Sequence, residues 1–398
     1  MAKRTIVALP GDGIGSIVLK QAIRVLDASG FISDYIYGDI GWQFWCKEGN
    51  PLPQRTLDLI KKHKIALFGA ITSKPNEEAM AELDPSLRGR GFVYSSPIVG
   101  LRQKFNLDIC VRPCKSYKGN PLNFIRRGSG GLIEEPNIDV VIFRQNTECM
   151  YSGVEWTNPP EQVYQALMTH PKFVENFGKV PVEELSVSAR IFTKKATERI
   201  LSAAFDHARK FGYSSVTVCE KPNVIRETSG LMWKLAKEIQ KSSFPEIKLL
   251  NTNIDAQMMW LTKNPEDYGV IVAGNMFGDI ASDAFAGLIG GLGFACSAQF
   301  SSDGIAVFEP THGSAPKYAG YEVPVVNPIA MIESACMLLD YIEEKSTAVR
   351  IRKAIAEIIQ EGKVRTYDMM KMKGSPEAIE NGAASTIQMT DAIISRIR

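Results

Sequence analysis

Two aspartates four residues apart are the residues in this chain whose type and spacing most directly imply chemistry. Asp279 and Asp283 follow an apolar run, Val270–Ala273, that is typical of a buried strand, and Gly278 after this run allows a sharp turn. If a helix begins near Asp279, the two carboxylates lie on one face at its N-terminal end. They would then lie beyond the carboxyl end of a strand, where open α/β sheets bind their ligands.

The close spacing of these carboxylates favours a metal site. Two carboxylates so near each other repel unless a cation or a hydrogen-bond donor lies between them. Hard cations such as Mg²⁺ and Mn²⁺ take oxygen ligands of this kind. The structural alternative is a helix N-cap Asp followed by a second, solvated Asp. Residues elsewhere in the chain have to decide between the two.

Three arginines could bind an acidic substrate beside such a cation. Arg102, Arg112 and Arg144 lie close to the ends of predicted strands or helices. A guanidinium group binds a carboxylate through two parallel hydrogen bonds, so three of them suit a substrate with several carboxylates. This requires a fold that brings them together, and the alternative for each is a surface ion pair.

Tyr151 and Lys221 are the titratable residues that could move protons. Lys221 lies just past a predicted strand and directly before Pro222. A lysine among other cations has a lowered pKa and can serve as a base or a proton relay. A tyrosine can donate a proton to a developing carbanion, although Tyr151 could also be an ordinary half-buried aromatic residue.

The segment His312–Pro316 offers backbone N–H groups and a flat ring, both suited to a nucleotide. Its alternative is a turn rich in Gly and Pro. A second glycine-rich segment, Pro10–Gly15, follows the first predicted strand. It fails the dinucleotide fingerprint G-x-G-x-x-G at the last position, Ser16, and no acidic residue closes a second strand about 20 residues on. We therefore expect a tight strand-to-helix turn there and no Rossmann site.

The elements that must position these residues alternate along the chain, which indicates an α/β fold. The predicted strands are Thr5–Leu9, Ile65–Ala70, a strand ending at Arg112-Pro113, Val140–Phe143, Ser215–Cys219, 246–250 and Val270–Ala273. The predicted helices are 16–28, 95–102, 193–211, a helix after Asn223, one carrying Asp255, a long apolar one opened by Asn327 and 348–361. Residues 73–95 read as a mobile surface loop, and residues 156–185 break the alternation as an inserted arm.

Composition excludes several classes of protein. The chain has 398 residues, of which 45% are hydrophobic and 23% charged, as in ordinary globular proteins. A net charge of +2 argues against nucleic-acid and membrane-surface partners. Seven scattered cysteines without a C-x-x-C pair indicate reduced thiols and a cytoplasmic protein. The least polar stretch, Ala284–Ala298, is too short and too rich in glycine to span a bilayer.

Taken together, the motifs resemble those of the β-decarboxylating dehydrogenases, the family of isocitrate, isopropylmalate and homoisocitrate dehydrogenases. The resemblance covers nearly the whole chain and rests on Pro10–Gly15, Leu101-Arg102 with Val111–Pro113, Phe143–Glu148 with Tyr151, Lys221–Asn223, Asn275–Asp283 and His312–Pro316.

The resemblance implies a distinctive, non-Rossmann α/β fold with two domains. The large, cofactor-side domain would comprise residues 1–113 and 300–398. The small domain, residues 114–299, would carry the dimer interface and an inserted arm at about 156–192. Family members are homodimers or larger, with each active site shared between two subunits.

The family oxidises a 2-hydroxy acid with NAD(P)⁺ and then releases the β-carboxylate as CO₂. By resemblance, the substrate would bind to Ser96 and the three arginines. Asp279 and Asp283 would hold Mg²⁺ or Mn²⁺, joined by Asp255 from the partner subunit. The partner's Lys221 would assist removal of the hydroxyl proton, and Tyr151 would protonate the enolate.

The cofactor implied is NADP⁺. The position of Lys317 is usually acidic in NAD-dependent members, whereas Lys317-Tyr318 and Tyr367 are similar to NADP-dependent bacterial isocitrate dehydrogenases. A cation suits a 2′-phosphate, and Lys371 keeps a charge where those enzymes often have arginine. The remaining residues expected on the cofactor are Thr72, His312, Gly313 and Asn327.

The residues before Arg102 match the isocitrate pattern only in part. Isocitrate enzymes typically have a serine and an asparagine there, and this chain has Ser96 but Ile98. We expect isocitrate as the substrate, with homoisocitrate or 3-isopropylmalate as alternatives. Two further alternatives are a non-catalytic regulatory subunit and a Mg²⁺-dependent lyase without redox chemistry.

Overall fold

The computed structural model describes residues 4–397 and centres on one ten-stranded sheet. The strands run in the order β11-β10-β12-β7-β4-β13-β14-β3-β1-β2. Their bounds are β1 (Arg4–Gly11), β2 (Ser33–Tyr37), β3 (Ile65–Ala70), β4 (Ile109–Lys115), β7 (Asp139–Gln145), β10 (Ser215–Glu220), β11 (Lys248–Asn253), β12 (Val270–Ala273), β13 (Cys296–Phe300) and β14 (Ala306–Pro310). Neighbours are parallel except in the middle, where β4 is antiparallel to β7 and β13, and β13 to β14. The order differs from the 3-2-1-4-5-6 order of a Rossmann sheet, as the failed fingerprint predicts.

The strands predicted from apolar runs are all present. β3 and β12 are buried along their whole length, because helices cover both faces of the sheet. β4 continues two residues past the predicted end, to Lys115. The sequence does not predict β13, because it carries two polar residues, Ser297 and Gln299, that are nevertheless buried.

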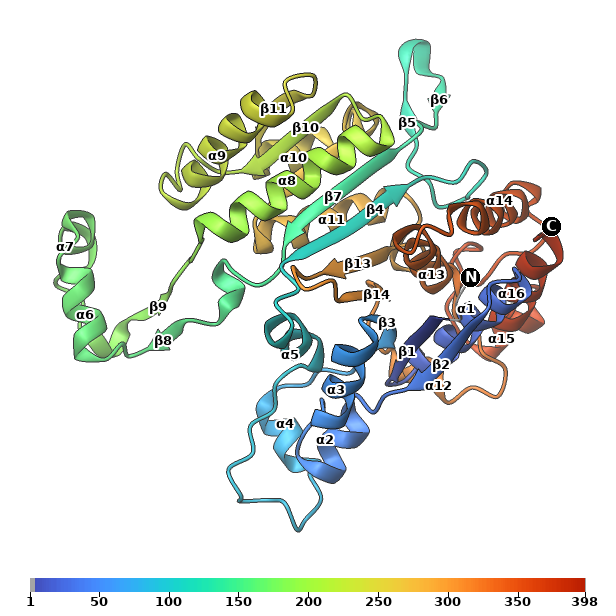
Figure 1. Cartoon of the computed structure of the whole chain (residues 1–398), viewed down its shortest axis with the longest axis horizontal. Helices are drawn as coiled ribbons and strands as arrows, with labels where there is room; N and C mark the ends of the chain where they lie inside the picture. The colour runs from blue at the N-terminus through green and yellow to red at the C-terminus, as the bar shows by residue number, and fades with distance from the viewer. Residues whose placement is uncertain (1–3, 398) are drawn as a thin grey trace.

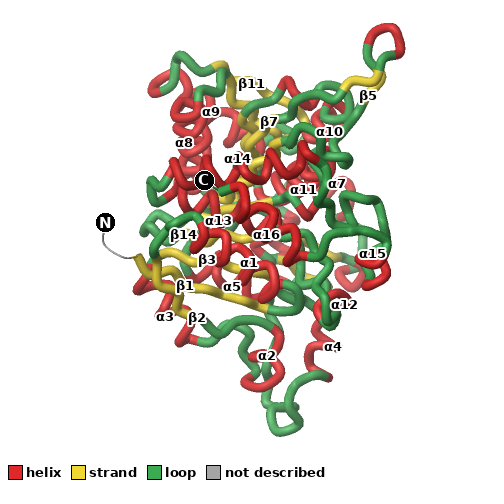
Figure 2. The backbone as a smooth tube through the Cα atoms, turned by 90° about the vertical axis from the view of Figure 1, so that its right-hand side faces the viewer, coloured by secondary structure: helices red, strands yellow, loops and turns green. Residues whose placement is uncertain are grey.

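Helices lie on both faces of the sheet (Figures 1 and 2). Their bounds are α1 (Gly15–Ala28), α2 (Trp42–Glu48), α3 (Gln54–His63), α4 (Asn76–Ala81), α5 (Pro97–Lys104), α6 (Glu161–Met168), α7 (Pro171–Phe177), α8 (Lys194–Phe211), α9 (Thr228–Ser243), α10 (Ile254–Trp260), α11 (Asn275–Leu288), α12 (Pro316–Ala319), α13 (Ile329–Tyr341), α14 (Lys345–Glu361), α15 (Pro376–Glu380) and α16 (Thr386–Arg396). α8 packs on β7 and β12, α13 packs on β13 and β14, and α11 packs on β7 and β4.

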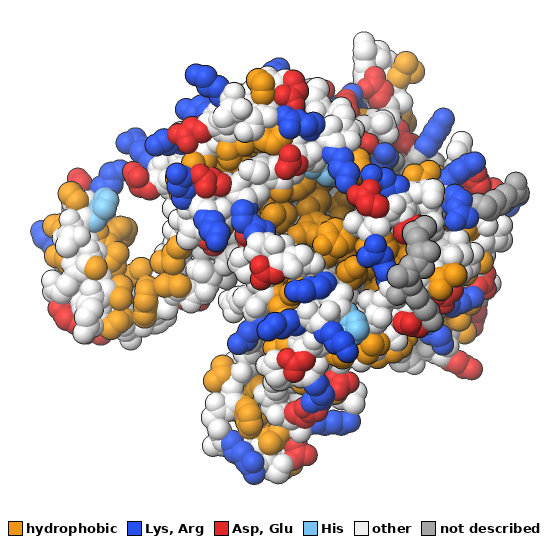
Figure 3. All heavy atoms as spheres, viewed as in Figure 1, with side chains coloured by type: hydrophobic (Ala, Val, Ile, Leu, Met, Phe, Trp, Pro, Cys, Tyr) orange, Lys and Arg blue, Asp and Glu red, His pale blue; other side chains and the backbone are white. Residues whose placement is uncertain are grey.

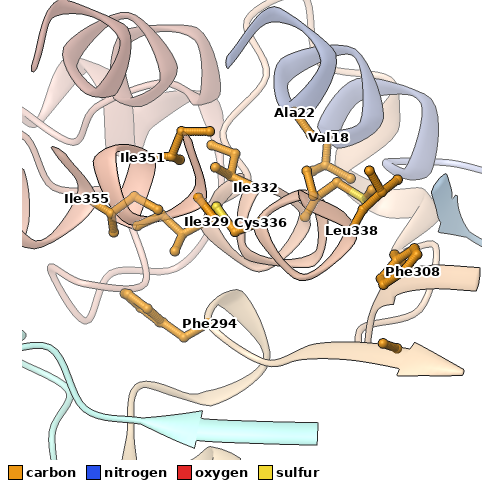
Figure 4. Close-up of a cluster of buried hydrophobic side chains, with 14 of the residues drawn as sticks. Val18, Ala22, Phe294, Phe308, Ile329, Ile332, Cys336, Leu338, Ile351 and Ile355 are labelled. Atoms are coloured by element: carbon orange, nitrogen blue, oxygen red, sulfur yellow. The ribbon is translucent and has the colours of Figure 1, made fainter. Parts of the chain in front are cut away.

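Two hydrophobic clusters form most of the core. In the larger one, side chains of α1, α13 and α14 converge, among them Val18, Ile332 and Ile351 (Figure 4). In the other, α8 and α9 pack on β7, β10 and β12. Phe300 and Met337 are only partly buried and touch both clusters, so they mark the seam between the two.

The predicted arm is present and projects from the body (Figure 1). It contains α6, α7 and an antiparallel pair formed by β8 (Glu155–Thr157) and β9 (Ser186–Ser188). Neither α6 nor α7 has a buried residue. A second projection is the hairpin of β5 (Arg126–Arg127) and β6 (Ile133–Glu134).

Two local expectations were wrong. α11 begins at Asn275, one turn before Asp279, and Gly278 lies inside the helix. A Cβ on Gly278 would lie 2.8 Å from the Cβ of Arg144, so this glycine permits close packing of helix on strand and makes no turn. Residues 73–95 are also not a plain loop, because α4 forms there and packs on Trp45, whose indole donates to the Ala79 carbonyl at 2.7 Å.

All seven cysteines are free thiols. Within residues 4–397, no helix is long and apolar enough to cross a membrane.

Candidate active site

Arg112 of β4 holds the two aspartates of α11 together. Its Nη1 donates to Asp279 Oδ1 at 3.1 Å, to Asp283 Oδ1 at 3.2 Å and to the Ser282 hydroxyl at 2.7 Å. The Arg112 side chain is 9% exposed, whereas those of Asp279 and Asp283 are 31% and 59% exposed. The carboxylates therefore face outward from a buried cation. Burial raises the pKa of Asp283, and the charge of Arg112 opposes this.

Arg144 lies beside Arg112 on the same face of the sheet. Arg112 pairs with Ile142 in the register of β4 and β7, and Arg144 is two residues further along β7. Arg144 forms an ion pair with Asp279, and its Nε donates to Asn275 Oδ1 at 2.9 Å. Burial, together with the charge of Arg112, lowers the pKa of Arg144 to about 10, so it remains cationic near neutral pH.

Asp279 and Asp283 fit a divalent cation by their donor chemistry. Both are carboxylates with exposed surface, one helical turn apart on α11. Oxygen donors of this kind are the ligands that Mg²⁺ and Mn²⁺ prefer. Across residues 4–397, no group of three or more His, Cys, Asp or Glu side chains is placed to hold a metal. The chain thus brings together two of the three predicted ligands, and Asp255 is not among them.

Arg102 of α5 is held by a buried polar network. Its Nε donates to Gln299 Oε1 at 2.9 Å, and its Nη2 lies 3.7 Å from a carboxylate oxygen of Glu309. Asn146 Nδ2 donates to the same Gln299 oxygen at 2.7 Å. Burial raises the pKa of Glu309, while the charges of Arg102 and Arg112 oppose this. Sequence reasoning missed Gln299 and Glu309, because their only signal is a polar residue within a strand.

A cavity of about 480 Å³ joins Arg102 to Tyr151. Tyr151 follows β7 in a short 3₁₀ helix, Met150–Ser152, and its ring lies 5.7 Å from the guanidinium carbon of Arg144. Burial, and then the nearby charge of Asp279, raise the pKa of the Tyr151 hydroxyl. A raised pKa keeps this hydroxyl protonated at neutral pH, as a proton donor requires.

Lys221 and Asp255 pair with each other, and within residues 4–397 neither forms a hydrogen bond or ion pair with Asp279 or Asp283. Lys221 Nζ lies 2.5 Å from Asp255 Oδ1. The two residues come from adjacent strand ends, because Glu220 of β10 pairs in register with Asn253 of β11. The hydrogen bond from Lys221 lowers the pKa of Asp255.

Glu220 is a residue of this region that sequence reasoning missed. It is fully buried and accepts hydrogen bonds from the Gly274 N–H at 2.8 Å, from Arg190 at 2.7 Å and from Ser229 at 2.6 Å. It therefore ties the end of β10, and with it Lys221, to the residue before α11. Its available signal was an acidic residue closing an apolar strand.

The cofactor-side loops also meet. The Thr72 and Ser314 hydroxyls lie 2.7 Å apart, and the Ser314 carbonyl accepts from the Ile14 N–H at 2.9 Å. A Cβ on Gly13, whose φ is +54°, would lie 2.2 Å from that carbonyl, so only glycine fits this approach. Asp12, which the sequence analysis did not single out, accepts from the N–H groups of Thr72 and Trp42 at 2.9 and 2.7 Å.

His312 has a ring nitrogen that a bound nucleotide could pair with. Its Nε2 is buried without a hydrogen-bond partner within residues 4–397, while Nδ1 lies 3.1 Å from the Gly313 carbonyl. Burial lowers the pKa of His312, so the ring is neutral near pH 7. A buried polar atom without a partner is costly, and a bound nucleotide group would supply one.

The basic residues predicted for the cofactor lie on two neighbouring segments. Lys317 Nζ lies 4.6 Å from the centre of the Tyr318 ring, which lies 5.7 Å from the Tyr367 ring. Asn327 donates to Asp368 at 3.0 Å, and the Lys371 N–H donates to the Asp368 carbonyl at 2.9 Å.

Known proteins resemble the chain over almost its whole length. Residues 5–393 match the sequence profile described as isocitrate/isopropylmalate dehydrogenase. A homoisocitrate dehydrogenase from Methanocaldococcus jannaschii is 36% identical over 394 residues, which cover 99% of this chain and 97% of that protein. Protein DlpA from Legionella pneumophila is 37% identical over 391 residues, which cover 98% of this chain but 58% of that protein.

A solved structure also resembles the chain over almost its whole length. The crystal structure of isocitrate dehydrogenase from Methylococcus capsulatus superposes with a TM-score of 0.80 at 33% identity, covering 99% of each chain.

Proposed function

Because the chain belongs to the isocitrate/isopropylmalate dehydrogenase family, a family of decarboxylating dehydrogenases of hydroxy acids, we propose that it converts isocitrate to 2-oxoglutarate and CO₂ with reduction of NADP⁺. The observation that carries this proposal is the grouping of Arg112, Arg144 and Tyr151 around Asp279 and Asp283. Cations, paired carboxylates and a protonated phenol are the groups that a polycarboxylate oxidation and decarboxylation needs.

Each residue of the site has a proposed role. Arg112 and Arg144 bind the substrate carboxylates, and Asp279 and Asp283 hold a divalent cation. When bound, that cation supplies Lewis-acid charge that lowers the pKa of the substrate hydroxyl and stabilises negative charge on the neighbouring oxygen. Tyr151 then returns a proton to the carbon that lost CO₂.

The proposal includes a homodimer with shared sites. Asp255 and Lys221 would join the α11 aspartates of the other subunit, since within one chain they pair with each other. The arm supports this, because α6 and α7 have no buried residue and expose Val174 and Phe177 at 45% and 50%. Exposed apolar side chains of this kind are typical of a subunit interface.

The position of Ile98 removes the objection that this residue raised against isocitrate in the sequence. Ile98 is partly buried and packs on the core cluster of Leu52 and Leu101, so it fills the core. The cavity beside Arg102 is lined instead by Val99, which lies one helical turn before the arginine. Ser96 lies next to Ser73, with their hydroxyls 3.4 Å apart.

Homoisocitrate is the second candidate. Its longer arm would need more room, and the cavity of about 480 Å³ between Arg102 and Tyr151 offers it. The identity of 36% to a homoisocitrate dehydrogenase favours the same substrate.

NADP⁺ is favoured over NAD⁺ by two cations on the cofactor side, Lys317 and Lys371, which would face a 2′-phosphate. Thr72, His312 and Gly313 would contact the rest of the nucleotide, with Asn327 on the adenine side. A cytoplasmic location, suggested by the free thiols, belongs to the same proposal.

The test compares kcat/KM for isocitrate, homoisocitrate and 3-isopropylmalate, each with NADP⁺ and with NAD⁺. We expect the highest value for isocitrate with NADP⁺. A large preference for 3-isopropylmalate contradicts the substrate assignment. A chain that turns over none of the three but activates a related enzyme is a regulatory subunit, and CO₂ release without nicotinamide reduction identifies a lyase.

A further inference from the structure

A second cavity lies on the face of the sheet opposite the candidate active site. Its volume is about 590 Å³, larger than the cavity at Arg102, and it opens between α8 and α13. Figure 3 shows it as an apolar hollow in the middle of this view, with charged side chains around its mouth. The volume falls within the range of roughly 300–1,000 Å³ that is usual for small-molecule sites.

The hollow exists because the two core clusters leave a strip of sheet uncovered. α8 covers β7 and β12, and α13 covers β13 and β14, each from its own cluster. Phe300 and Met337 are partly buried where the two clusters meet, and both line the cavity. Apolar side chains that are buried on one side only are left without packing partners, and a ligand would provide these.

The walls of the hollow are aromatic. On the α8 side, the His207 ring lies 4.4 Å from Phe211 and is stacked at 5.8 Å on Tyr213. On the α13 side, Phe300 and Tyr341 are stacked at 5.4 Å. Flat rings on both sides of a cavity are complementary to a flat ring between them.

The cavity is lined by three basic and four acidic side chains, most of which are paired, so no strong charge of one sign faces a ligand; these are Lys115, Lys210, Arg352, Asp139, Asp206, Glu333 and Asp340. Lys115 pairs with Asp139 at 3.0 Å, and Arg352 pairs with Glu333 at 3.0 Å and with Asp340 at 2.7 Å. The ring nitrogens of His207 make no hydrogen bond to any residue of the described chain. Burial lowers the pKa of His207 to about 4, and nearby Lys210 adds to this while Asp139 opposes it, so the ring offers a neutral donor or acceptor.

The cavity also lies directly behind the substrate arginines. Val111 and Pro113 of β4 line it, and Arg112 between them points to the other face. On β7, Phe143 lines the cavity, and Arg144 next to it points to the active site. A ligand that moves these strand residues therefore moves the two guanidinium groups.

We propose that this aromatic cavity binds an uncharged, planar ring compound, and that its binding changes the affinity of the active site for the hydroxy acid. The first part rests on the rings, the largely paired charges and the unpaired His207 nitrogens. The second part rests on the alternation of residues along β4 and β7, and it uses the proposed substrate-binding role of the arginines.

The binding test uses the full chain and two related fluorescent probes, neutral N-phenyl-1-naphthylamine and its anionic sulfonate, 1-anilinonaphthalene-8-sulfonate. We expect the neutral probe to bind with a stoichiometry of one per chain and more tightly than the sulfonate. Ala203→Trp, on the α8 wall, should weaken the neutral probe at least tenfold by filling the cavity. Ala28→Trp is the matched control, because Ala28 is exposed at the end of α1 and away from the cavity.

Tyr341→Ala tests the same cavity by removing one of its aromatic rings. The Tyr341 side chain is 39% exposed, so this variant keeps the proposal testable if Ala203→Trp fails to fold. Equal affinities of the neutral probe for the wild type and for Tyr341→Ala overturn the assignment of the site, and tighter binding of the sulfonate overturns the ligand class. None of these measurements requires turnover, so they stand apart from the test of the proposed function.

The coupling is tested by the KM of the preferred hydroxy acid with and without saturating neutral probe. We expect a change of about fivefold in the wild type and in Ala28→Trp, and no change in Ala203→Trp. A KM that the bound probe leaves unchanged overturns the coupling.

Discussion

Lys221 and Asp255 form an ion pair at 2.5 Å within one chain, at the ends of two neighbouring strands. Glu220, next to Lys221, accepts a hydrogen bond from the Gly274 N–H just before α11. The strand end that carries the pair is thus attached to the helix that carries Asp279 and Asp283, yet the pair makes no contact with these two aspartates in the described chain. This arrangement makes sense if each pair serves a different active site of a dimer.

Mixed dimers test this sharing of sites. We expect Lys221→Met and Asp283→Asn each to abolish most activity. When the two variants are unfolded and refolded together, half of the dimers combine both chains, and one of their two sites is intact. Activity should therefore return to about a quarter of the wild-type value. Sites built from a single chain would give no recovery, and each variant refolded alone is the control.

Metal affinity tests the α11 aspartates without turnover. Asp283→Asn should weaken Mn²⁺ binding, measured by calorimetry, by at least about tenfold, because it removes one charged ligand beside a buried arginine. Asp303→Asn, at an exposed acid in the turn after β13, should leave Mn²⁺ affinity unchanged. Equal Mn²⁺ affinities of the wild type and Asp283→Asn would show that this carboxylate pairs with Arg112 and does not bind the metal.

The choice of cofactor should depend on Lys317. Lys317→Asp places a carboxylate where the proposal puts the 2′-phosphate, so we expect kcat/KM for NADP⁺ to fall at least about a hundredfold. The value for NAD⁺ should change by less than about threefold. Lys353→Asp, at an exposed lysine on α14, controls for the change in net charge. Equal decreases of kcat/KM with both cofactors contradict a role for Lys317 in binding the 2′-phosphate.

Local patterns predicted much of the fold, while the partners of the site residues could not be predicted. An apolar run such as Ile65–Ala70 determines a buried strand by itself, and its bounds were predicted to the residue. Arg102 and Gln299, by contrast, are 197 residues apart in sequence, and no local signal pairs them. Gly278 shows how a local signal misleads, because a glycine marks a turn as readily as a close approach to Arg144.

The acidic residues that support the site were missed for a related reason. Asp12 lies inside the Pro10–Gly15 motif but was not assigned a role there, and Glu220 belongs to no motif; each accepts backbone N–H groups from segments distant in sequence. A search for acids that end apolar strands or lie inside tight turns would have found both. Their hydrogen bonds explain why a charged residue persists where burial penalises it.

The stability of the fold in mild acid should depend on His207. Its pKa of about 4 lies below the ordinary value of 6.5, chiefly because of burial. A depressed folded-state pKa means that the unfolded chain binds the proton more readily. The contribution of the neutral His207 ring to the free energy of unfolding is therefore complete above pH 6.5, and it is lost as the pH falls towards 4. By pH 4.5 the loss amounts to about 2 kcal/mol of unfolding free energy, less what solvent screening removes.

His207→Gln removes this titrating group and keeps a polar side chain between Phe143 and Tyr213. Its Tm should therefore fall less than the wild-type Tm between pH 7 and pH 4.5, although it starts lower at pH 7 because ring contacts are lost. His170→Gln, at an exposed histidine of the arm, is the matched control and should follow the wild type. Parallel Tm curves for the wild type and His207→Gln would show that this imidazole does not limit the acid stability of the fold. Thermal unfolding followed by circular dichroism at half-unit pH steps measures all three proteins.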